Sequence, residues 1–594
     1  MTIVAWMRKR WMWVLGCVVV VVVGAVALGF RTVRSMVTID VATTEVQHPF
    51  NRALFSWGEP DGMLGWPAVG LNAYLQTHPA GTYARQGVNV GSLCPMADGT
   101  CAGQALNYNA MFNYIGAAPN TTAVGKGVTP DQMIQREISY GETPQLLFLG
   151  RPDLAQSDPQ AWANLVVRVL EHFDGSGTSF KPVVPAIEIW NEDNTKKFWK
   201  GTPEQYFSLF EVTAKTVHQA LPQVLVGGPT VCCPGYPNQY GVNFLQADAP
   251  YMNIFIFHDY SSAEAEVAHL ASWVNVLKNS FHIADPKIMV TESDPQWAGS
   301  GYPKEEALLS RQFGLLPYWN DIVSWDEFHV GAYKQYGMIN NNGTVIDKNY
   351  WPYWIFRGAT GEQVQSRVLP KTGSGTAAPD VVSTVADSQQ QVNTVIYLPP
   401  GAGAVGEKVR VNVTLPSRAV WLLSVSALSP SFHGVSGVRL LDATTKYTGQ
   451  WEMQPGEALS FTFRQGKALD AASPLINFGL APAPTAKSAS SSTLVGAGET
   501  LIATATIFNT TGAPITGEMS LGGLSTGLSG WSARAARPGS VTLQPGQSRT
   551  FSFTVKRAGS LSNQPVLDAQ FAWKGTNGTS GTAMSVGELA PLPS

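Results

Sequence analysis

The sequence has little charge and no excess of basic residues. Of its 594 residues only 14% are Asp, Glu, Lys or Arg, and the formal net charge is −3. A chain without a basic field lacks the electrostatic footprint of a nucleic-acid-binding protein, so we expect no nucleic-acid partner. The low charge, together with 58 glycines and 39 prolines, is typical of an exported, loop-rich protein.

Cysteines are also few. Cys17 lies in an apolar run, which leaves Cys94, Cys101, Cys232 and Cys233 in the remainder of the chain. An even number in an exported protein indicates disulfides. Cys94 and Cys101 form the simplest local pair, and the neighbouring Cys232 and Cys233 could instead bridge to those two. No histidine stands at ligand spacing near these cysteines, so zinc is the less favoured alternative, and we expect no metal and no organic cofactor.

One long apolar run stands near the start of the sequence. Residues 11–30 supply about twenty apolar residues, enough to cross a bilayer as one transmembrane helix. The basic residues at 8–10 predict that the preceding side is cytoplasmic. A cleavable signal peptide is the alternative, since residues 25–27 read Ala-Val-Ala. Both interpretations place the rest of the chain outside the cytosol: membrane-anchored and periplasmic or extracellular, or else secreted.

Residues 45–362 alternate between short apolar strands and helical stretches. The pattern predicts strands at 54–57, 82–85, 145–149, 186–190, 224–226, 253–257, 287–291 and 322–325. Continuous apolar strands separated by helices indicate a parallel sheet. Eight such units fit a closed (β/α)₈ or TIM barrel. An open doubly wound sheet is the alternative, although no glycine-rich phosphate loop follows any of these strands.

After residue 362 the helical periodicity stops. Short alternating runs separated by Gly and Pro turns predict a β-sandwich over 363–480. Residues 481–492 are a Pro/Ser-rich linker, and 493–594 form a second all-β unit that resembles an immunoglobulin-like sandwich. The predicted order is therefore an anchor over 1–35, a barrel and two all-β domains. We expect the last domain to be a spacer, with polysaccharide binding as the alternative.

Two of the predicted strands run directly into a glutamate, Glu192 after the fourth strand and Glu292 after the seventh. The strands of a (β/α)₈ barrel all open at the same mouth, so both carboxylates are expected there. A glycosidase needs such a pair, one residue as acid/base and the other as nucleophile. A gap of about 5 Å permits retention of configuration and a wider gap implies inversion. Either glutamate alone could merely cap a helix or pair with an arginine.

An ordered series of short motifs surrounds the two glutamates. They occupy residues 188–192, 198–200, 206–207, 211–215, 226–229, 258–260, 291–292, 325 and 336–340. This series resembles glycoside hydrolase family 39, one of the clan A retaining glycosidases. The likeness covers about 45–360, is strongest over 186–292, and implies a barrel followed by the sandwich that usually accompanies it.

The resemblance implies a role for each matching position. Glu192 matches the acid/base and Glu292 the nucleophile. Asn191 matches the residue that hydrogen-bonds the sugar 2-hydroxyl, for which an amide offers both donor and acceptor. His258 and Tyr260 match a pair that lines the site and orients the nucleophile, and the less favoured alternative for His258 is a satisfied histidine at the barrel rim.

Three further residues are candidates for binding substrate. Trp325 resembles the aromatic floor under the reacting sugar, and Trp199 is expected to contact substrate. Arg85 resembles a basic residue beside the nucleophile. The alternatives are an ordinary core tryptophan at 325, a hydrophobic plug at 199 and a structural ion pair at Arg85.

The sequence departs from the family where its cleft is expected. Asp193 and Asn194 stand where Pro-Asn often follows the acid/base, and Ser293 and Asp294 replace a frequent tryptophan, so the sugar cannot be inferred from the family. We expect a retaining glycoside hydrolase, endo-acting on a bacterial exopolysaccharide or matrix polysaccharide. Its anchor and family resemble enzymes encoded with exopolysaccharide synthesis systems, so that synthesis or export machinery is a possible partner. An exo-acting β-xylosidase-like enzyme and a non-catalytic polysaccharide-binding protein are the alternatives.

Overall fold

The computed structural model describes most of the chain from residue 36 onward. The described residues are 36–58, 82–93, 105–108, 129–174, 183–233, 237–294, 304–327, 350–369, 378–386, 389–400, 406–429, 432–465, 474–482, 500–523, 531–535, 539–557 and 566–588. No helix within these ranges is long and apolar enough to cross a membrane. The predicted anchor over 1–35 lies outside them.

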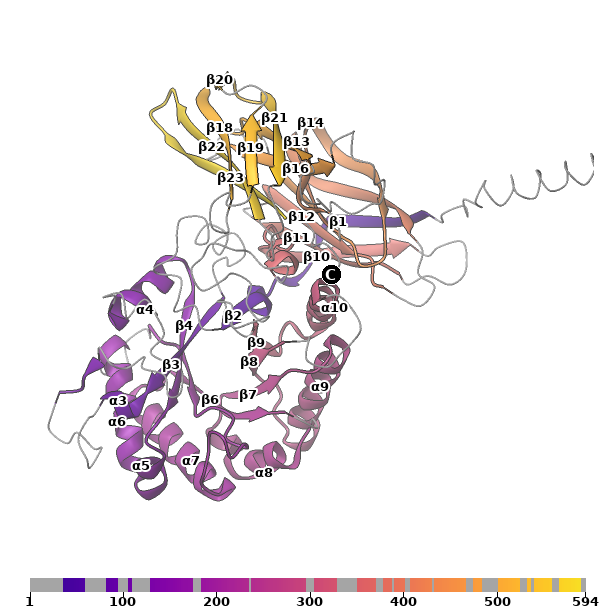
Figure 1. The fold of residues 1–594 in the computed structure, drawn as a ribbon. Helices are drawn as coiled ribbons and strands as arrows, with labels where there is room; N and C mark the ends of the chain where they lie inside the picture. Colours follow the sequence, from indigo (N-terminus) through magenta and orange to yellow (C-terminus); the bar gives the residue numbers. More distant parts are fainter. Residues whose placement is uncertain are drawn as a thin grey trace, which may run out of the picture.

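Eight strands form a closed barrel in chain order, and each pairs in parallel with its neighbours (Figure 1). They are β2 (Ser56–Gly58), β3 (Tyr83–Asn89), β4 (Thr143–Leu149), β5 (Ala186–Ile189), β6 (Leu225–Cys232), β7 (Ile254–Asp259), β8 (Ile288–Ser293) and β9 (Ile322–Glu327). Each predicted strand overlaps one of these.

Helices connect the strands and cover the barrel on the outside (Figure 1). They are α3 (Val90–Leu93), α4 (Pro130–Ser139), α5 (Pro152–Ser157), α6 (Pro159–Asp174), α7 (Pro203–Ala220), α8 (Gln239–Asp248), α9 (Ala263–Asn275) and α10 (Lys304–Leu315), with α11 (Trp351–Trp354) following β9. Short helical turns η1 (Arg52–Phe55), η5 (Ala249–Tyr251), η6 (Val276–Ser280) and η7 (Leu316–Tyr318) join them.

The start of α7 follows from its sequence. The Thr202 side chain accepts a hydrogen bond from the backbone N–H of Gln205, and the Gln205 side chain accepts one from the backbone N–H of Thr202. Pro203 occupies the first turn, where no backbone donor is needed. The helix packs closely on β6, because a Cβ on Gly228 would lie only 2.7 Å from the Phe210 ring. This close approach requires a glycine in the motif at 226–229.

The inner face of the barrel is apolar at one end and polar at the other. Ala186, Ile254, Ile256 and Met289 form a small buried cluster. One pleat further along β5, at the period of two that strands impose, Glu188 begins a polar layer toward the mouth. The site described below is built on that polar layer.

The second domain is a seven-stranded sheet that closes on itself, because β1 pairs with both β10 and β13. Its strands are β1 (Met36–Pro49), β10 (Glu362–Leu369), β11 (Asp380–Ala386), β12 (Gln391–Tyr397), β13 (Glu407–Ser429), β14 (Phe432–Met453) and β15 (Ala458–Gln465). The strand that precedes the barrel in sequence thus lies in this sheet, and the predicted boundary at residue 45 falls inside β1.

The third domain packs two four-stranded sheets around a core that includes Phe553, Phe571 and Trp573. One sheet holds β16 (Leu475–Pro482), β17 (Thr500–Phe508), β21 (Ser548–Arg557) and β19 (Trp531–Ala535). The other holds β20 (Ser540–Leu543), β18 (Ile515–Gly523), β22 (Val566–Gly575) and β23 (Ser580–Glu588). β16 contacts β14 of the second domain, and it begins before the predicted linker at 481–492.

The barrel and the second domain share buried contacts. The Tyr397 hydroxyl donates to the backbone carbonyl of Glu306 on α10 at 3.1 Å and lies 3.0 Å from Ser310 Oγ. Val382, Val395 and Tyr397 belong to the same buried hydrophobic cluster as the barrel helices. The sheet therefore buttresses the α10 side of the barrel, as Figure 1 shows.

Candidate active site

Glu192 and Glu292 meet at the carboxyl end of the barrel. Glu192 follows β5 in a tight loop in which both Trp190 and Glu192 have positive φ angles, 67° and 44°. Such angles in non-glycine residues cost of order 1–3 kcal/mol each and are found where a function fixes the chain. The loop is held by the Thr195 N–H, which donates to the Glu192 carbonyl at 2.8 Å. It also contacts Thr230, whose Oγ1 lies 3.0 Å from the Trp190 carbonyl oxygen and shares its one proton between that oxygen and Glu188.

Glu292 owes its direction to an irregularity in β8. Phe257 pairs with Val290 and the next residue, His258, pairs with Glu292, so Thr291 is one extra residue in β8. A bulge of this kind changes the alternation of side chains and is common beside active sites. Thr291 and Glu292 consequently both make contacts in the polar layer, whereas strict alternation would send one of them outward.

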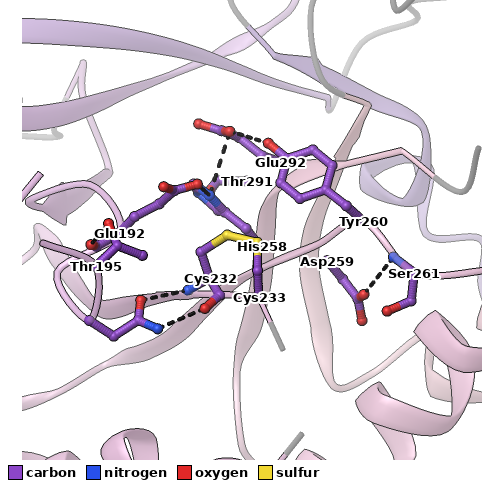
Figure 2. Close-up of a disulfide and its surroundings, with 11 residues drawn as sticks. Glu192, Thr195, Cys232, Cys233, His258, Asp259, Tyr260, Ser261, Thr291 and Glu292 are labelled. Carbon is purple, nitrogen blue, oxygen red and sulfur yellow. Dashed lines mark hydrogen bonds and ion pairs between the residues drawn. A yellow bond between two sulfur atoms is a disulfide. The ribbon is translucent and has the colours of Figure 1, made fainter. Parts of the chain in front are cut away.

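The two carboxylates are close. One oxygen of Glu192, one oxygen of Glu292 and a ring nitrogen of His258 all lie within 4.8 Å of one another, and Figure 2 shows the three side chains together. The Glu292 side chain is 7% exposed and that of Glu192 is 13% exposed. Carboxyl groups about 5–5.5 Å apart suit a double displacement through a covalent intermediate, and an inverting pair is farther apart.

Glu292 is held ionised. Arg85 Nη1 donates to its Oε1 at 2.8 Å, and the Tyr260 hydroxyl donates to its Oε2. Burial alone would raise the pKa of Glu292, but the positive charges of His258 and Arg85 outweigh it. Together with the hydrogen bonds from Tyr260 and Arg85, they lower this pKa to about 2. At neutral pH the carboxylate is therefore available as a nucleophile.

His258 lies between the two glutamates. Its Nδ1 is 3.2 Å from Glu192 Oε1 and 3.5 Å from Glu292 Oε2, and its Nε2 is 3.1 Å from Thr291 Oγ1. Burial would lower the pKa of His258, but the charge of Glu292 and the hydrogen bond with Glu192 raise it. The Thr291 hydroxyl donates to Glu188, which leaves its lone pairs to accept from His258 Nε2–H.

Arg85 and the buried Glu188 form the base of the site. Arg85 Nε and Nη2 donate to the two oxygens of Glu188 at 2.8 and 3.0 Å, and Thr230 Oγ1 donates to Glu188 Oε1 at 2.8 Å. Burial would lower the pKa of Arg85, but Glu188 and Glu292 raise it well above its ordinary value. In the sequence analysis, Glu188 was named only as the first residue of the motif at 188–192 and was given no role in the site. Its place on the inward face of β5 is the signal that could have identified it as a site residue.

Asn191 is fixed by the same guanidinium. Its Oδ1 accepts from Arg85 Nη2 at 3.0 Å, and the residue is 2% exposed. The amide orientation leaves the –NH₂ group as a donor beside the glutamates, which suits a sugar hydroxyl.

Asp326 on β9 is a second buried carboxyl that the sequence analysis missed. It is fully buried and accepts a hydrogen bond from Ser324. Burial raises its pKa to about 8, and the nearby negative charges of Glu188 and Glu292 add to this rise. Asp326 is thus mostly a neutral acid at pH 7. Its position two residues beyond Ser324, on the same face of the strand, was readable from the period of two.

The predicted role of Trp325 is wrong. Its side chain is fully buried, its Nε1 donates to Ser293 Oγ at 3.1 Å, and its ring lies under the Arg311 guanidinium of α10. Because Ser324 and Asp326 face the barrel interior, the residue between them faces the helices. Trp325 is therefore part of the strand–helix core, and Ser293 packs on the same outer side.

Trp199 is likewise part of the core and not of the substrate surface. It is 1% exposed, donates from Nε1 to the Thr202 carbonyl at 2.9 Å, and meets Trp190 edge to face at 5.0 Å. The alternative of a hydrophobic plug beneath the loop is the correct one. Trp199 supports the backbone of the Glu192 loop from below.

The residues at 193–194, which depart from the family pattern, tie the Glu192 loop to β6. Asp193 Oδ1 accepts from the Thr230 N–H at 2.8 Å, and burial raises the pKa of Asp193 to about 7. The Asn194 side chain bonds both backbone groups of Cys232, donating to its carbonyl at 2.7 Å and accepting from its N–H at 2.9 Å.

Cys232 and Cys233 form a disulfide with each other, which rules out bridges from this pair to Cys94 and Cys101. The latter two lie outside the described residues. In the described part of the chain, two groups have the donors for a metal: Glu192 with His258 and Glu292, and Glu192 with the two bonded cysteines. The first is the glutamate pair itself, and the disulfide occupies the sulfur atoms of the second.

Comparison with known proteins assigns the central part of the barrel to a family. Residues 136–278 match the model described as glycosyl hydrolases family 39. A β-xylosidase of Geobacillus stearothermophilus is 37% identical over 89 residues, which are 15% of this chain and 17% of that protein. The match therefore spans less than a fifth of the length of this curated relative.

Solved structures share the overall architecture. A bacterial orthologue of human α-L-iduronidase has a TM-score of 0.59 at 12% identity, covering 93% of this chain and 100% of its own. A glucosidase of Croceicoccus marinus has a TM-score of 0.55 at 11% identity, covering 72% and 99%. A monomeric β-xylosidase of Caulobacter crescentus CB15 has a TM-score of 0.53 at 13% identity, also covering 72% and 99%. Identities this low show a common fold only.

Proposed function

Since residues 136–278 belong to the glycosyl hydrolases of family 39, we propose that this chain is a retaining glycoside hydrolase with Glu192 as acid/base and Glu292 as nucleophile. The observation that carries the proposal is the pair of carboxylate oxygens within 4.8 Å, one of them on a carboxylate held ionised by Arg85 and Tyr260.

The first half of the reaction forms a glycosyl-enzyme. The Glu292 carboxylate attacks the anomeric carbon as the bond to the leaving oxygen breaks, and Glu192 donates its proton to that oxygen. Loss of this proton leaves Glu192 negative, and His258 Nδ1, 3.2 Å away, stabilises the new charge. The Asn191 amide is placed to bind the 2-hydroxyl as positive charge develops on the sugar.

The second half returns the enzyme to its starting state. The Glu192 carboxylate removes a proton from water, the water oxygen attacks the anomeric carbon, and the bond to Glu292 breaks. Arg85 and Tyr260 stabilise the released carboxylate of Glu292 as its charge returns. The two inversions give net retention, with no metal or organic cofactor in either step.

The substrate that we propose is a bacterial exopolysaccharide or matrix polysaccharide, cut within the chain. Support comes from the apolar run at 11–30, which would hold the enzyme at the outer face of the membrane, and from the two additional β-domains. This location would also bring the enzyme near exopolysaccharide synthesis or export machinery. If the apolar run is cleaved, the protein would be secreted.

An exo-acting β-xylosidase is the second candidate function. The relative that favours it is the Geobacillus stearothermophilus β-xylosidase, which is 37% identical over 89 residues. Release of single sugars from chain ends would distinguish this activity from internal cleavage. A polysaccharide-binding protein without turnover is the third, and intact glutamates argue against it.

The test uses the full chain in detergent, with Glu192→Gln and Glu292→Gln variants as controls. It is incubated with the source organism's own exopolysaccharide and with aryl β-xylosides, and products are sized by mass spectrometry. Oligosaccharide ladders from the wild type alone would establish an endo-hydrolase, and free xylose would establish the exo-acting alternative. Intact polymer and intact xyloside in every tube would contradict hydrolysis and leave binding.

Azide separates the roles of the two glutamates. With Glu292→Gly, azide should replace the nucleophile and give a glycosyl azide of inverted configuration. With Glu192→Ala, it should attack the glycosyl-enzyme and give the retained configuration. The opposite pattern of products would reverse the assignment.

A further inference from the structure

A disulfide lies at the mouth of the barrel beside Glu192. Cys232 is the last residue of β6 and is bonded to Cys233, which follows it. One Glu192 carboxylate oxygen and the two sulfur atoms lie within 4.8 Å of one another. Figure 2 shows the disulfide below the Glu192 carboxylate in this view and the Glu292 carboxylate above it. The disulfide thus adjoins the acid/base and not the nucleophile.

This disulfide is an apolar group in polar surroundings. Cys232 is 3% exposed, whereas Cys233 is exposed to solvent. A disulfide has no hydrogen to donate, and its sulfur atoms are polarisable. Its contact with an apolar C–H surface is therefore more favourable than its contact with water. The pyranose ring of a sugar presents such a C–H face next to its hydroxyls.

The position of the disulfide relative to Glu192 is fixed by several hydrogen bonds. The Asn194 side chain bonds both backbone groups of Cys232, and the Thr230 N–H bonds Asp193. Asn194 and Asp193 both belong to the loop that carries Glu192. A movement of the disulfide would therefore move the acid/base loop with it, and the two present one preorganised surface.

The chemistry of the proposed reaction indicates which sugar unit of the substrate contacts the disulfide. Glu192 protonates the glycosidic oxygen, and the reacting sugar lies between Glu192 and Glu292. The leaving group continues beyond that oxygen, on the side of Glu192 away from the nucleophile. We propose that the Cys232–Cys233 disulfide forms the wall of the leaving-group subsite and packs against the C–H face of a sugar bound there. The inference rests on the proposed glycosidase function and adds to it a preference for a saccharide as leaving group.

The test compares leaving groups on one sugar, once the active sugar is known. The substrates are an oligosaccharide and the corresponding glycosyl fluoride, whose leaving group is too small to reach the disulfide. The variant is Cys232→Ala/Cys233→Ser, measured in the full chain. We expect the ratio of kcat/KM for the oligosaccharide to that for the fluoride to fall at least tenfold, mainly through KM.

Transfer to an acceptor gives a second readout of the same subsite. When the fluoride is the donor, an acceptor sugar must bind where the leaving group binds in hydrolysis. The ratio of transfer product to hydrolysis product should therefore fall in the variant by a similar factor. Reduction of the wild type with a phosphine should reproduce the change, and the same reductant should have no further effect on the double variant.

The outcomes are distinct. A fall in the ratio through kcat alone, with KM for the oligosaccharide unchanged, would mean that the disulfide only supports the Glu192 loop, because fluoride leaves without a proton from the acid/base. Unchanged ratios would mean that the disulfide does not touch substrate. Either result overturns the inference. If the wild type cleaves neither substrate, the proposed function itself fails. If the wild type cleaves both substrates and the variant shows the same ratio of kcat/KM values as the wild type, the proposed subsite is wrong and the proposed glycosidase function stands.

Discussion

Arg85 and Glu292 form a buried ion pair, with Nη1 of the arginine 2.8 Å from Oε1 of the glutamate. The same guanidinium binds Glu188 through two further hydrogen bonds and Asn191 through a third. The planar fork of arginine can serve these acceptors together, which the single ammonium of lysine cannot do. One strand residue on β3 thus sets the positions of side chains from β5, its following loop and β8.

Arg85→Lys should lower kcat/KM by about 100-fold, which corresponds to ~2.7 kcal/mol of transition-state stabilisation. Lysine keeps the charge but cannot hold Glu188, Asn191 and Glu292 at once. Steady-state kinetics on the active substrate would measure the loss. Arg367→Lys is the matched control, since Arg367 pairs with Glu45 at 3.4 Å on the surface, and should change nothing. Equal activity of Arg85→Lys and wild type would contradict the positioning role.

Tyr260→Phe should shift the acid limb of the kcat/KM profile to higher pH. The hydroxyl donates to ionised Glu292, and its loss removes one of the interactions that lower this pKa to about 2. A hydrogen bond to a charged group is worth about 1.5–3 kcal/mol, so a shift of about one to two pH units is expected. The pH profiles of the two proteins, recorded on one substrate, test this. Superimposable acid limbs would show that Glu292 ionises independently of Tyr260.

Asp326→Asn should stabilise the protein near neutral pH. The folded pKa of Asp326, about 8, lies above the ordinary value, so the folded state binds one more proton than the unfolded state between about pH 4 and pH 8. Stability is therefore lost as pH rises through this window, by up to about 4 kcal/mol at pH 7. Asparagine removes this dependence. Thermal unfolding at pH 7 should favour the variant, and the advantage should vanish near pH 4.

Trp325→Phe should lower stability and leave the affinity for substrate unaltered. The change removes the Nε1–H bond to Ser293 and part of a fully buried ring, which together cost about 1–3 kcal/mol. Thermal unfolding and KM, measured on the same preparations, separate the two effects. A raised KM at unchanged stability would restore Trp325 to the sugar-binding surface.

Asn194→Ala should reduce kcat more than it changes KM. The side chain joins the loop of Glu192 to the backbone of Cys232, and without it the acid/base is less well oriented in the transition state. A tenfold loss in kcat is about 1.4 kcal/mol, the value of one or two such hydrogen bonds. Asn243→Ala, which removes a surface amide that accepts from Gln239, provides the matched control. A variant with normal kcat would show that Asp193 and Thr230 hold the loop unaided.

The features that the sequence predicted are those that depend on local pattern. The apolar strands and the glutamates at the ends of β5 and β8 follow from short-range periodicity and from the common mouth of parallel strands. The direction of Trp325 was missed because the motif suggested a sugar platform, although the alternation along β9 sends Ser324 and Asp326 inward instead.

Other features depend on contacts between distant parts of the chain. Nothing in the alternating run at 36–49 shows that it pairs with residues 362–369 and 408–414, because strand partners are selected by the whole fold. The bond between Cys232 and Cys233 was equally open in the sequence, since cysteine number does not determine connectivity. Asp193 and Asn194 gained an explanation only when Thr230 and Cys232 were seen beside them.

The barrel is inserted between two neighbouring strands of one sheet, since Pro49 at the end of β1 pairs with Glu362 at the start of β10. A pull on residue 36 would therefore act on β1 in shear, against its hydrogen bonds to β10 and β13. The chain enters the barrel from β1 and returns from it to β10, which is the neighbouring strand. The force would therefore pass through the sheet and not through the barrel. If the apolar run at 11–30 anchors the chain as proposed, drag from a viscous polymer would load this sheet before the catalytic barrel.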